Sequence, residues 1–379
     1  GSIGTSTIDL VRRHPDRFRI VGATTHRRVD ELGALAAEFD VPHLLVTDPE
    51  AAREFRREHP RWSDRLVGEG PDGLVDIVTA VDGAMIVNGV VGAAGMRPTI
   101  EALAHGHDVA LANKEALVVG GPLVLRAAEQ GGGRLWPVDS EHSAIAQCLR
   151  GNPTSEVSRL WLTASGGSFR DRDPSTMGDI TLAEILDHPT WDMGPKITVD
   201  SATMMNKGLE ILEAHYLFGI ELARIEVVIH RQSIVHSMVE FQDGAFLAQM
   251  GQPDMRVPIL YALSRGEHQA TDVAPFDPVS GGSLTFETPD PARYPCLELA
   301  KRAAAVGGCA PIVLNAANEV AVAAVLREEL SFVEIPRVIE AALDVDHGGE
   351  VASLDEALDV DRRTRETARE LVGGFSRTA

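Results

Sequence analysis

Residues 18–48 read FRIVGATTHRRVDELGALAAEFDVPHLLVTD. Residues 18–25 and 43–48 are apolar runs of strand length, and residues 29–39 between them repeat apolar side chains with a helical period. Apolar strands that alternate with helical segments indicate a parallel sheet covered by helices on both faces. The stretch therefore predicts a doubly wound α/β domain.

The same alternation extends over the first part of the chain. Further strand-like runs lie at residues 76–81, 84–90 and 108–113, which predicts a Rossmann-like domain over residues 1–138. The opening GSIG is similar to the second half of a dinucleotide fingerprint, without the strand and first glycine that precede it. We therefore expect the Rossmann sheet to lack its first strand, and a flexible terminus is the alternative interpretation of GSIG.

The remainder of the chain divides into three parts. Residues 139–265 mix strand-like runs with Gly, Ser and Met and predict a central α+β catalytic domain. Residues 266–295 are rich in Pro and Gly, as in a linker, and residues 296–379 have a helical period that predicts a C-terminal α-helical domain. The strand-like runs of the central part are residues 135–139, 159–165, 196–200, 225–230 and 246–250.

Composition narrows the class of protein. A length of 379 residues is enough for two or three domains, and the 44% hydrophobic fraction is ordinary for a globular protein. The formal net charge of -21 argues against nucleic acid as a partner, and no apolar run is long enough for a membrane helix. The cysteines number three and have no CxxC spacing, so we expect buried structural thiols and a cytoplasmic location.

Two carboxylates stand together in LWPVDSEHSAI, residues 135–145. Asp139 and Glu141 follow a predicted strand, and positions i and i+2 of a strand point to the same side. Ligands of open α/β sheets bind at the carboxyl ends of strands, and paired hard oxygen donors suit Mg²⁺ or Mn²⁺. The motif predicts a metal site, with a solvated strand end or helix cap as the alternative.

A second polar cluster lies in VDSATMMNKGLEILEAH, residues 199–215. Ser201, Asn206 and Lys207 are of the residue types that bind phosphate. Glu210 follows Lys207 by three positions and would share its face on a helix, so it could add a third carboxylate to the metal. A capped helix start explains the same residues.

Two loops carry further candidates. Ser165 precedes Gly166 and Gly167 in LTASGGSFR, where a glycine turn can form an anion-binding nest. His188 and Trp191 lie, with Met193, in DHPTWDMGPK, a loop bounded by Pro and Gly that suggests a lid over a substrate. An ordinary turn and a surface loop are the alternatives.

Cofactor candidates follow two strands of the first domain. Asn113, Lys114 and Glu115 come directly after the run at residues 108–113, although Asn113 could be a helix cap. NAD-specific sites place an acid near the end of the second strand to bind the ribose 2′-hydroxyl. FRIVGATT is instead followed by His26, Arg27 and Arg28, and two guanidinium groups could bind a 2′-phosphate. The sequence therefore favours NADPH.

Taken together, these motifs resemble those of the 1-deoxy-D-xylulose 5-phosphate reductoisomerase family. DSATMMNKGLE is the most specific of them. The matching stretches, which span the chain from residue 1 to about residue 326, are GSIGTST, VGAAG, LANKEALV, PVDSEHSAI, LTASGGSFR, HPTWDMGPKITVDSATMMNKGLE, IVHSMVEFQDG, PDMR and LNAANEVAVAAVL.

The resemblance implies roles for individual residues. One divalent ion, Mg²⁺ or Mn²⁺, would be bound by Asp139, Glu141 and Glu210, with Lys114 and His188 as further catalytic residues. The substrate, a phosphorylated sugar, would be bound by Ser140, Ser165, His188, Trp191, Ser201, Asn206 and Lys207. NADPH would be bound by Gly1, Ser2, Ile3, Asn113, Glu115 and Met255, in addition to Arg27 and Arg28.

The implied reaction is the rearrangement and NADPH-dependent reduction of 1-deoxy-D-xylulose 5-phosphate to 2-C-methyl-D-erythritol 4-phosphate, by a homodimer. The sequence departs from the family at His26, Ser143 and Arg231, where Gly, Asn and Pro are usual. One alternative is another two-domain oxidoreductase, such as a semialdehyde dehydrogenase with a nucleophilic cysteine, although Cys148 lies in a helical run. Another is a phosphate-binding protein without enzymatic activity.

Overall fold

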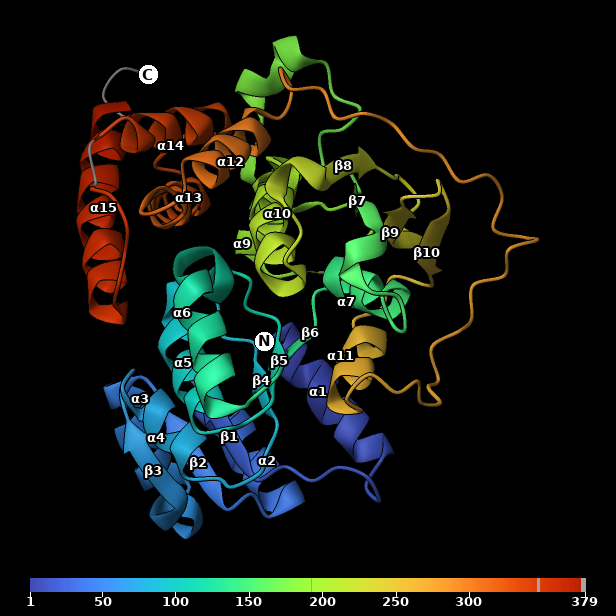
Figure 1. The fold of residues 1–379 in the computed structure, drawn as a ribbon. Coiled ribbons are helices and arrows are strands. Elements are labelled where there is room, and N and C mark those ends of the chain that lie inside the picture. Colours follow the sequence, from blue (N-terminus) through green and yellow to red (C-terminus); the bar gives the residue numbers. More distant parts are fainter. Residues whose placement is uncertain (192, 346–347, 376–379) are drawn as a thin grey trace.

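The computed structural model describes residues 1–191, 193–345 and 348–375. Its N-terminal region alternates helices and strands along the chain, as the sequence predicts (Figure 1). The elements are α1 (Ser2–Arg13), β1 (Gly22–Thr25), α2 (Val29–Phe39), β2 (His43–Val46), α3 (Pro49–Glu58), β3 (Leu66–Glu69), α4 (Gly73–Thr79), β4 (Ile86–Asn88), α5 (Met96–Ala104), β5 (Val109–Leu111), α6 (Glu115–Gly131) and β6 (Leu135–Pro137).

These strands form two separate parallel sheets of three strands each. Their orders are β1-β2-β3 and β4-β5-β6, so β1 and β4 each lie at an edge. Gly22 to Thr24 of β1 and Ile86 and Val87 of β4 line the same cavity. Within the described residues no strand pairs with both edges.

Two predicted strands are helices instead. Residues 76–81 overlap α4, in which Leu74, Ile77 and Val78 are buried on one face at helical spacing. Residues 196–200 lie in α9 (Pro195–Ala202), which begins with a proline at its first position. Short apolar runs do not distinguish a strand from a buried helix, and this ambiguity explains both errors. The sequence also missed β3.

The central region is the mixed α+β unit that was expected. Its sheet has the order β10-β9-β7-β8, in which β7 and β8 are parallel and β9 is antiparallel to both β7 and β10. The elements, besides α9, are α7 (Ser140–Cys148), β7 (Val157–Ala164), α8 (Leu182–Leu186), α10 (Met205–Phe218), β8 (Ile225–Ile229), β9 (Val235–Phe241), β10 (Phe246–Met250) and α11 (Arg256–Leu263).

The C-terminal region is helical, as predicted. It consists of α12 (Pro295–Val306), α13 (Ala310–Leu326), α14 (Ile335–Leu343) and α15 (Leu354–Phe375). The stretch before it has no helix or named strand between α11 and α12, and a single bridge joins its Glu287 to Ile229. None of the helices in the described ranges is both long enough and apolar enough to cross a membrane.

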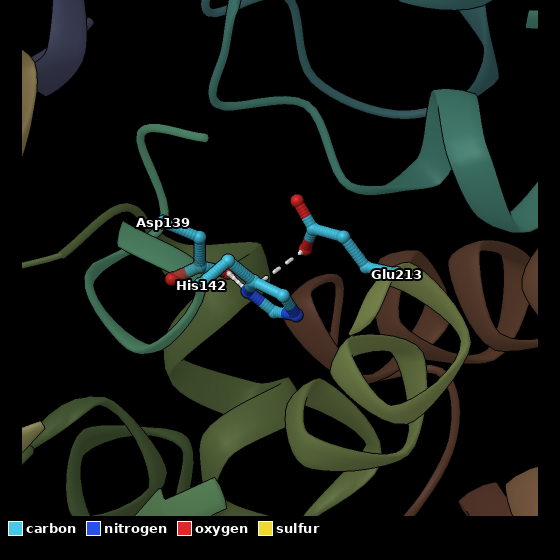
Figure 2. A group of neighbouring side chains, drawn as sticks. All are labelled: Asp139, His142 and Glu213. Carbon is cyan, nitrogen blue, oxygen red and sulfur yellow. Dashed lines mark ion pairs between the residues drawn. The ribbon is translucent and has the colours of Figure 1, made fainter. Parts of the chain in front are cut away.

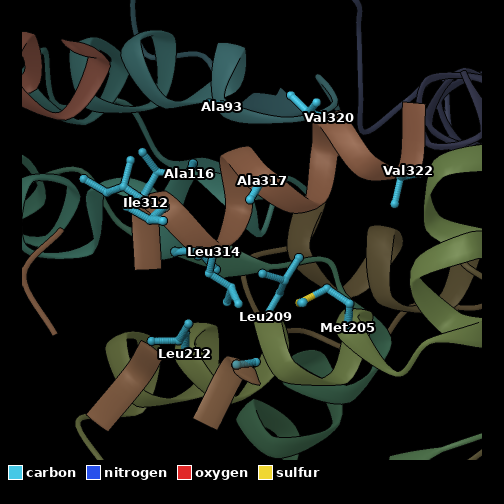
Figure 3. Close-up of a cluster of buried hydrophobic side chains, with 14 of the residues drawn as sticks. Ala93, Ala116, Met205, Leu209, Leu212, Ile312, Leu314, Ala317, Val320 and Val322 are labelled. Atoms are coloured by element: carbon cyan, nitrogen blue, oxygen red, sulfur yellow. The ribbon is translucent and has the colours of Figure 1, made fainter. Parts of the chain in front are cut away.

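One hydrophobic cluster joins all three regions. Leu314 and Ala317 of α13 belong to the same buried cluster as Leu209 of α10 and Ala116 of α6 (Figure 3). Each of these four side chains is fully buried. The C-terminal helices therefore pack against the two regions that line the cavity, and they hold α6 and α10 in place.

Candidate active site

A cavity of about 1120 Å³ lies between the two parallel sheets and the central region. Most of the candidates from the sequence line it, although they come from distant parts of the chain. They are Gly1, Ser2, Ile3, Lys114, Glu115, Asp139, Ser140, Glu141, Ser165, His188, Trp191, Ser201, Asn206, Lys207 and Met255.

Three carboxylates converge at one side of this cavity. Asp139 immediately precedes α7 and lies two positions after the end of β6, Glu141 lies in the first turn of α7, and Glu210 is in α10. Oxygen atoms of the three lie within 4.8 Å of one another. The expected strand geometry of Asp139 and Glu141 is wrong, because β6 ends at Pro137 and both residues stand at the start of a helix.

Two lysines neutralise these carboxylates. Lys207 Nζ lies 2.8 Å from Glu141 Oε1 and 2.5 Å from Glu210 Oε2. Lys114 Nζ contacts Asp139 Oδ2 and lies 3.2 Å from Glu210 Oε1. Both lysines are buried, so each ammonium group replaces its hydration by contacts with the carboxylates.

The carboxylates have different pKa values because their surroundings differ. Burial, and then the neighbouring charge of Glu141, raises the pKa of Glu210 to about 7. Burial would also raise the pKa of Asp139, but Lys114 holds it below its usual range. Asn206 donates from Nδ2 to Glu210 Oε1 at 2.6 Å and accepts from Lys114 Nζ at 2.7 Å. Asp139 and Glu141 line the cavity, whereas Glu210 is fully buried behind them and is absent from the lining. Three hard oxygen donors so close together fit Mg²⁺ or Mn²⁺.

Asp139, His142 and Glu213 form a second group of possible metal ligands, which shares Asp139 with the first group (Figure 2). His142 Nε2–H donates to the backbone oxygen of Glu210 at 2.9 Å, which leaves Nδ1 facing Glu213 Oε2 at 3.4 Å. Burial lowers the pKa of His142 to about 4 and raises that of Glu213 well above its usual value. Neither side chain lines the cavity.

A neutral hydrogen-bonding group lies elsewhere in the cavity. His188 Nδ1 accepts from the backbone N–H of Trp191 at 2.9 Å, so the proton is on Nε2. His188 Nε2 lies 3.0 Å from Ser165 Oγ and 3.1 Å from Ser201 Oγ. Burial lowers the pKa of His188 to about 4. This group offers uncharged donors for an anion.

Gly167 allows the backbone to approach this group closely. Its φ is +70°, and a Cβ built there would lie 2.5 Å from the backbone oxygen of Ser201. Only glycine fits without distortion. Lys207 and Asn206, expected beside the serines, instead contact the carboxylates described above.

The structure divides the predicted cofactor residues into two sets. Gly1, Ser2, Ile3 and Met255 line the cavity, as does Glu115. The remaining three are absent from the cavity lining, although the sequence predicted cofactor contacts for them. They are Arg27, Arg28 and Asn113.

The three residues outside the cavity have partners within the protein. Asn113 is buried and donates to the backbone oxygens of residues 90 and 92, so its amide holds that loop. Arg27 pairs with Asp48 at 2.8 Å and Arg28 with Glu31 at 3.3 Å. Both arginines are largely exposed just beyond the carboxyl end of β1.

The departures from the family pattern lie away from the carboxylates. His26 is exposed, and Ser143 is fully buried in α7. Arg231 pairs with Asp171 at 2.5 Å and with Glu287 at 2.6 Å. None of these side chains contacts the carboxylate cluster in the part of the chain that is described.

The three cysteines are free and buried, as expected. Burial raises the pKa of Cys148 to about 11 and also raises the pKa of Cys296 and of Cys309. A thiol with a raised pKa is a poor nucleophile at neutral pH. The alternative of a cysteine-dependent semialdehyde dehydrogenase therefore loses its support.

The sequence missed several residues at the site. Glu213 follows Glu210 by three positions, a spacing that places both on one helix face and could have indicated it. His236 lines the cavity, with its ring centroid 6.2 Å from that of Trp191. Lys196 lines it too and contacts Glu115, 81 positions away, and such a partner leaves no local signal.

Comparisons with known proteins identify the family of this chain. Residues 1–121 match the family model for 1-deoxy-D-xylulose 5-phosphate reductoisomerase, residues 135–218 match the model for its C-terminal domain, and residues 250–367 match a further DXP reductoisomerase C-terminal domain model.

Relatives and solved structures cover almost the whole chain. The 1-deoxy-D-xylulose 5-phosphate reductoisomerase of Thermosynechococcus vestitus is 48% identical over 98% of this chain and 91% of its own length, and that of Synechocystis is 48% identical over 98% and 95%. A DOX-P reductoisomerase in complex with NADPH, fosmidomycin and magnesium is 41% identical, with a TM-score of 0.93 and coverage of 98% of this chain and 96% of that chain. The Zymomonas mobilis enzyme in complex with NADPH is 39% identical, with a TM-score of 0.90 and the same coverage. This chain therefore belongs to the 1-deoxy-D-xylulose 5-phosphate reductoisomerase family.

Proposed function

We propose that this chain converts 1-deoxy-D-xylulose 5-phosphate to 2-C-methyl-D-erythritol 4-phosphate with NADPH and one divalent ion. The observation that carries the proposal is the convergence of Asp139, Glu141 and Glu210 within 4.8 Å beside a cavity. The same cavity holds a neutral serine–histidine group and the start of α1. Phosphate, metal and nucleotide sites would thus share one space.

The three carboxylates would hold Mg²⁺ or Mn²⁺. When bound, the ion supplies Lewis acidity that polarises the carbonyl and hydroxyl oxygens of the substrate during its rearrangement. Lys114 and Lys207 already contact these carboxylates, so their ammonium groups can turn toward substrate oxygens once a cation shares the negative charge. Each then acts as a donor close to the reacting atoms.

Ser165, Ser201 and His188 would bind the substrate phosphate. The neutral His188 donates from Nε2, and the close backbone approach at Gly167 adds to the anion site. Trp191, three residues beyond His188, would cover the substrate and exclude water, while Asn206 and Ser140 would contact its hydroxyl groups. Phosphate contacts remote from the reacting carbons provide binding energy for closure of this loop.

NADPH would lie along the edges of the two parallel sheets. Gly1, Ser2 and Ile3 open α1, and the N-terminus of a helix is favourable for a pyrophosphate. Met255 lines the same cavity and would pack beside the nicotinamide. Arg27 and Arg28 would leave their surface ion pairs, which are weak, to contact the 2′-phosphate.

A spectrophotometric assay tests the function. NADPH oxidation should occur only when both the deoxyxylulose phosphate and Mg²⁺ or Mn²⁺ are present, and a chelator should stop it reversibly. The product should be identified by mass spectrometry and NMR as the branched methylerythritol phosphate. Oxidation that proceeds without the metal, or with a linear product, would contradict the proposal.

We propose a homodimer because the edge strand β10 exposes apolar side chains. Phe246, Leu247 and Met250 are 50%, 43% and 40% exposed on an edge strand, an arrangement that normally requires a cover. Leu247→Glu should shift the protein to monomers in light scattering, whereas Val279→Glu, in the irregular stretch before α12, should not. A monomeric wild-type protein would contradict the proposed homodimer.

Free, buried cysteines support a cytoplasmic location, which cell fractionation can test.

A further inference from the structure

A chain of polar contacts beside the cavity connects three regions of the protein. Lys196 Nζ lies 2.5 Å from Glu115 Oε1 and 2.8 Å from Asp200 Oδ2. Asp200 Oδ1 accepts from Asn318 Nδ2 at 2.8 Å. Glu115 begins α6, Lys196 and Asp200 belong to α9, and Asn318 belongs to α13. One ammonium group thus ties α9 to the start of α6.

These charges are shielded from solvent. The side chains of Asp200, Glu115 and Lys196 are 1%, 9% and 19% exposed. Burial alone would lower the pKa of Lys196, but the two carboxylates raise it, and Lys196 in turn holds the pKa of Glu115 below its usual range. Apolar side chains of similar size would stabilise the fold as well as a buried ion pair does. Stability alone therefore does not explain the arrangement.

The position of Lys196 relates it to two parts of the site. It is the second residue of α9 and directly follows the loop that carries His188 and Trp191. Glu115, Lys196 and Asp200 all line the cavity, whereas Asn318 is buried behind them. Any shift of this ammonium group would move the end of the loop and the Glu115 carboxylate together.

We propose that Lys196 is a positioning residue for NADPH, which orients the Glu115 carboxylate toward the nicotinamide-side ribose and anchors the end of the substrate-covering loop. This inference rests on the proposed function and on the assignment of Glu115 to the cofactor. The ammonium group of Lys196 has three N–H donors, and two of them point to the carboxylates of Glu115 and Asp200. It contacts Oε1 of Glu115, so Oε2 can accept from a ribose hydroxyl.

The test compares Lys196→Met with Lys196→Arg and with the control Lys301→Met, which breaks an exposed ion pair to Glu298. The Kd for NADPH is measured by titration without substrate, and the metal activation constant, both KM values and kcat are measured by NADPH oxidation. Lys196→Met should weaken NADPH binding about tenfold, which is the size expected for coupled neighbours. Its metal activation constant should stay unchanged, and Lys196→Arg should recover part of the affinity.

A double-mutant cycle with Glu115→Gln gives the second readout. If Lys196 acts through Glu115, the double variant should bind NADPH no more weakly than Lys196→Met alone. Additive losses, an unchanged Kd for NADPH, or a fall in kcat with both KM values unchanged would overturn the inference. Melting temperatures identify a variant that does not fold, and Lys196→Gln, which keeps a donor, then takes its place. Wild-type turnover is measured first, so failure of the proposed function is seen separately.

Discussion

Glu210→Gln is expected to weaken Mg²⁺ binding and lower turnover by at least about a hundredfold, since even partners outside the coordination shell contribute about 10–100-fold. The carboxylate of Glu210 is fully buried between Lys114 and Lys207 and faces the oxygens of Asp139 and Glu141. An amide keeps the shape but offers one neutral oxygen. Isothermal titration with Mg²⁺, together with the dependence of NADPH oxidation on metal concentration, measures the loss.

Glu213→Gln is the matched comparison for this result. Glu213 lies one helical turn further along α10 and belongs to the alternative ligand group with Asp139 and His142. That group contains an imidazole and has one member in the cavity lining, Asp139, whereas the first group has two, Asp139 and Glu141, so the second group suits Mg²⁺ less well. Glu213→Gln should therefore change the Mg²⁺ affinity much less than Glu210→Gln. A larger loss of Mg²⁺ affinity in Glu213→Gln than in Glu210→Gln would show that the metal binds to the second group.

Lys114→Met should lower the free energy of unfolding by about 3–5 kcal/mol, the typical cost of leaving buried charges without their partner. Lys114 contacts Asp139 and Glu210, and these carboxylates keep the pKa of Lys114 well above its ordinary value although burial opposes the charge. Without it, the carboxylates repel one another in a site sheltered from water. Urea denaturation of the variant and the wild type gives the difference.

Mg²⁺ distinguishes this charge effect from a simple packing defect. A divalent ion among the carboxylates supplies the positive charge that Lys114→Met removes, so saturating Mg²⁺ should stabilise the variant more than the wild type. Lys301→Met, which breaks an exposed pair, should change stability by less than about 1 kcal/mol. Equal stabilisation of the variant and the wild type by Mg²⁺ would show that Lys114 does not balance the metal site.

Much of the fold could be predicted because its signals are local. The apolar period of residues 29–39, the strands at residues 22–25 and 43–46 and the C-terminal helices all follow from the spacing of side chains along the chain. The errors at residues 76–81 and 196–200 arise where a run is short enough to suit either a strand or a helix. Burial against α5 and α10 decides such cases, and the sequence does not contain that information.

The predictions for the site residues were less consistent than those for the fold. Motif resemblance identified Asp139, Glu141 and Glu210, but the strand geometry offered for the first pair was wrong, because both residues begin a helix. Asn113 matched a cofactor motif, yet its amide is used by neighbouring backbone groups. The partner of Lys196 is 81 positions away, and pairing at that separation depends on how α6 and α9 pack.

The hydrophobic cluster shared by α6, α10 and α13 affects how the protein loses its structure. Leu314 of α13 lies in one buried cluster with Leu209 of α10 and Ala116 of α6, so the C-terminal helices cannot detach without exposing apolar side chains to water. Their local unfolding would also release α6 and α10, which carry Glu115 and Glu210. The C-terminal helices and the carboxylates of the cavity should therefore lose their order together.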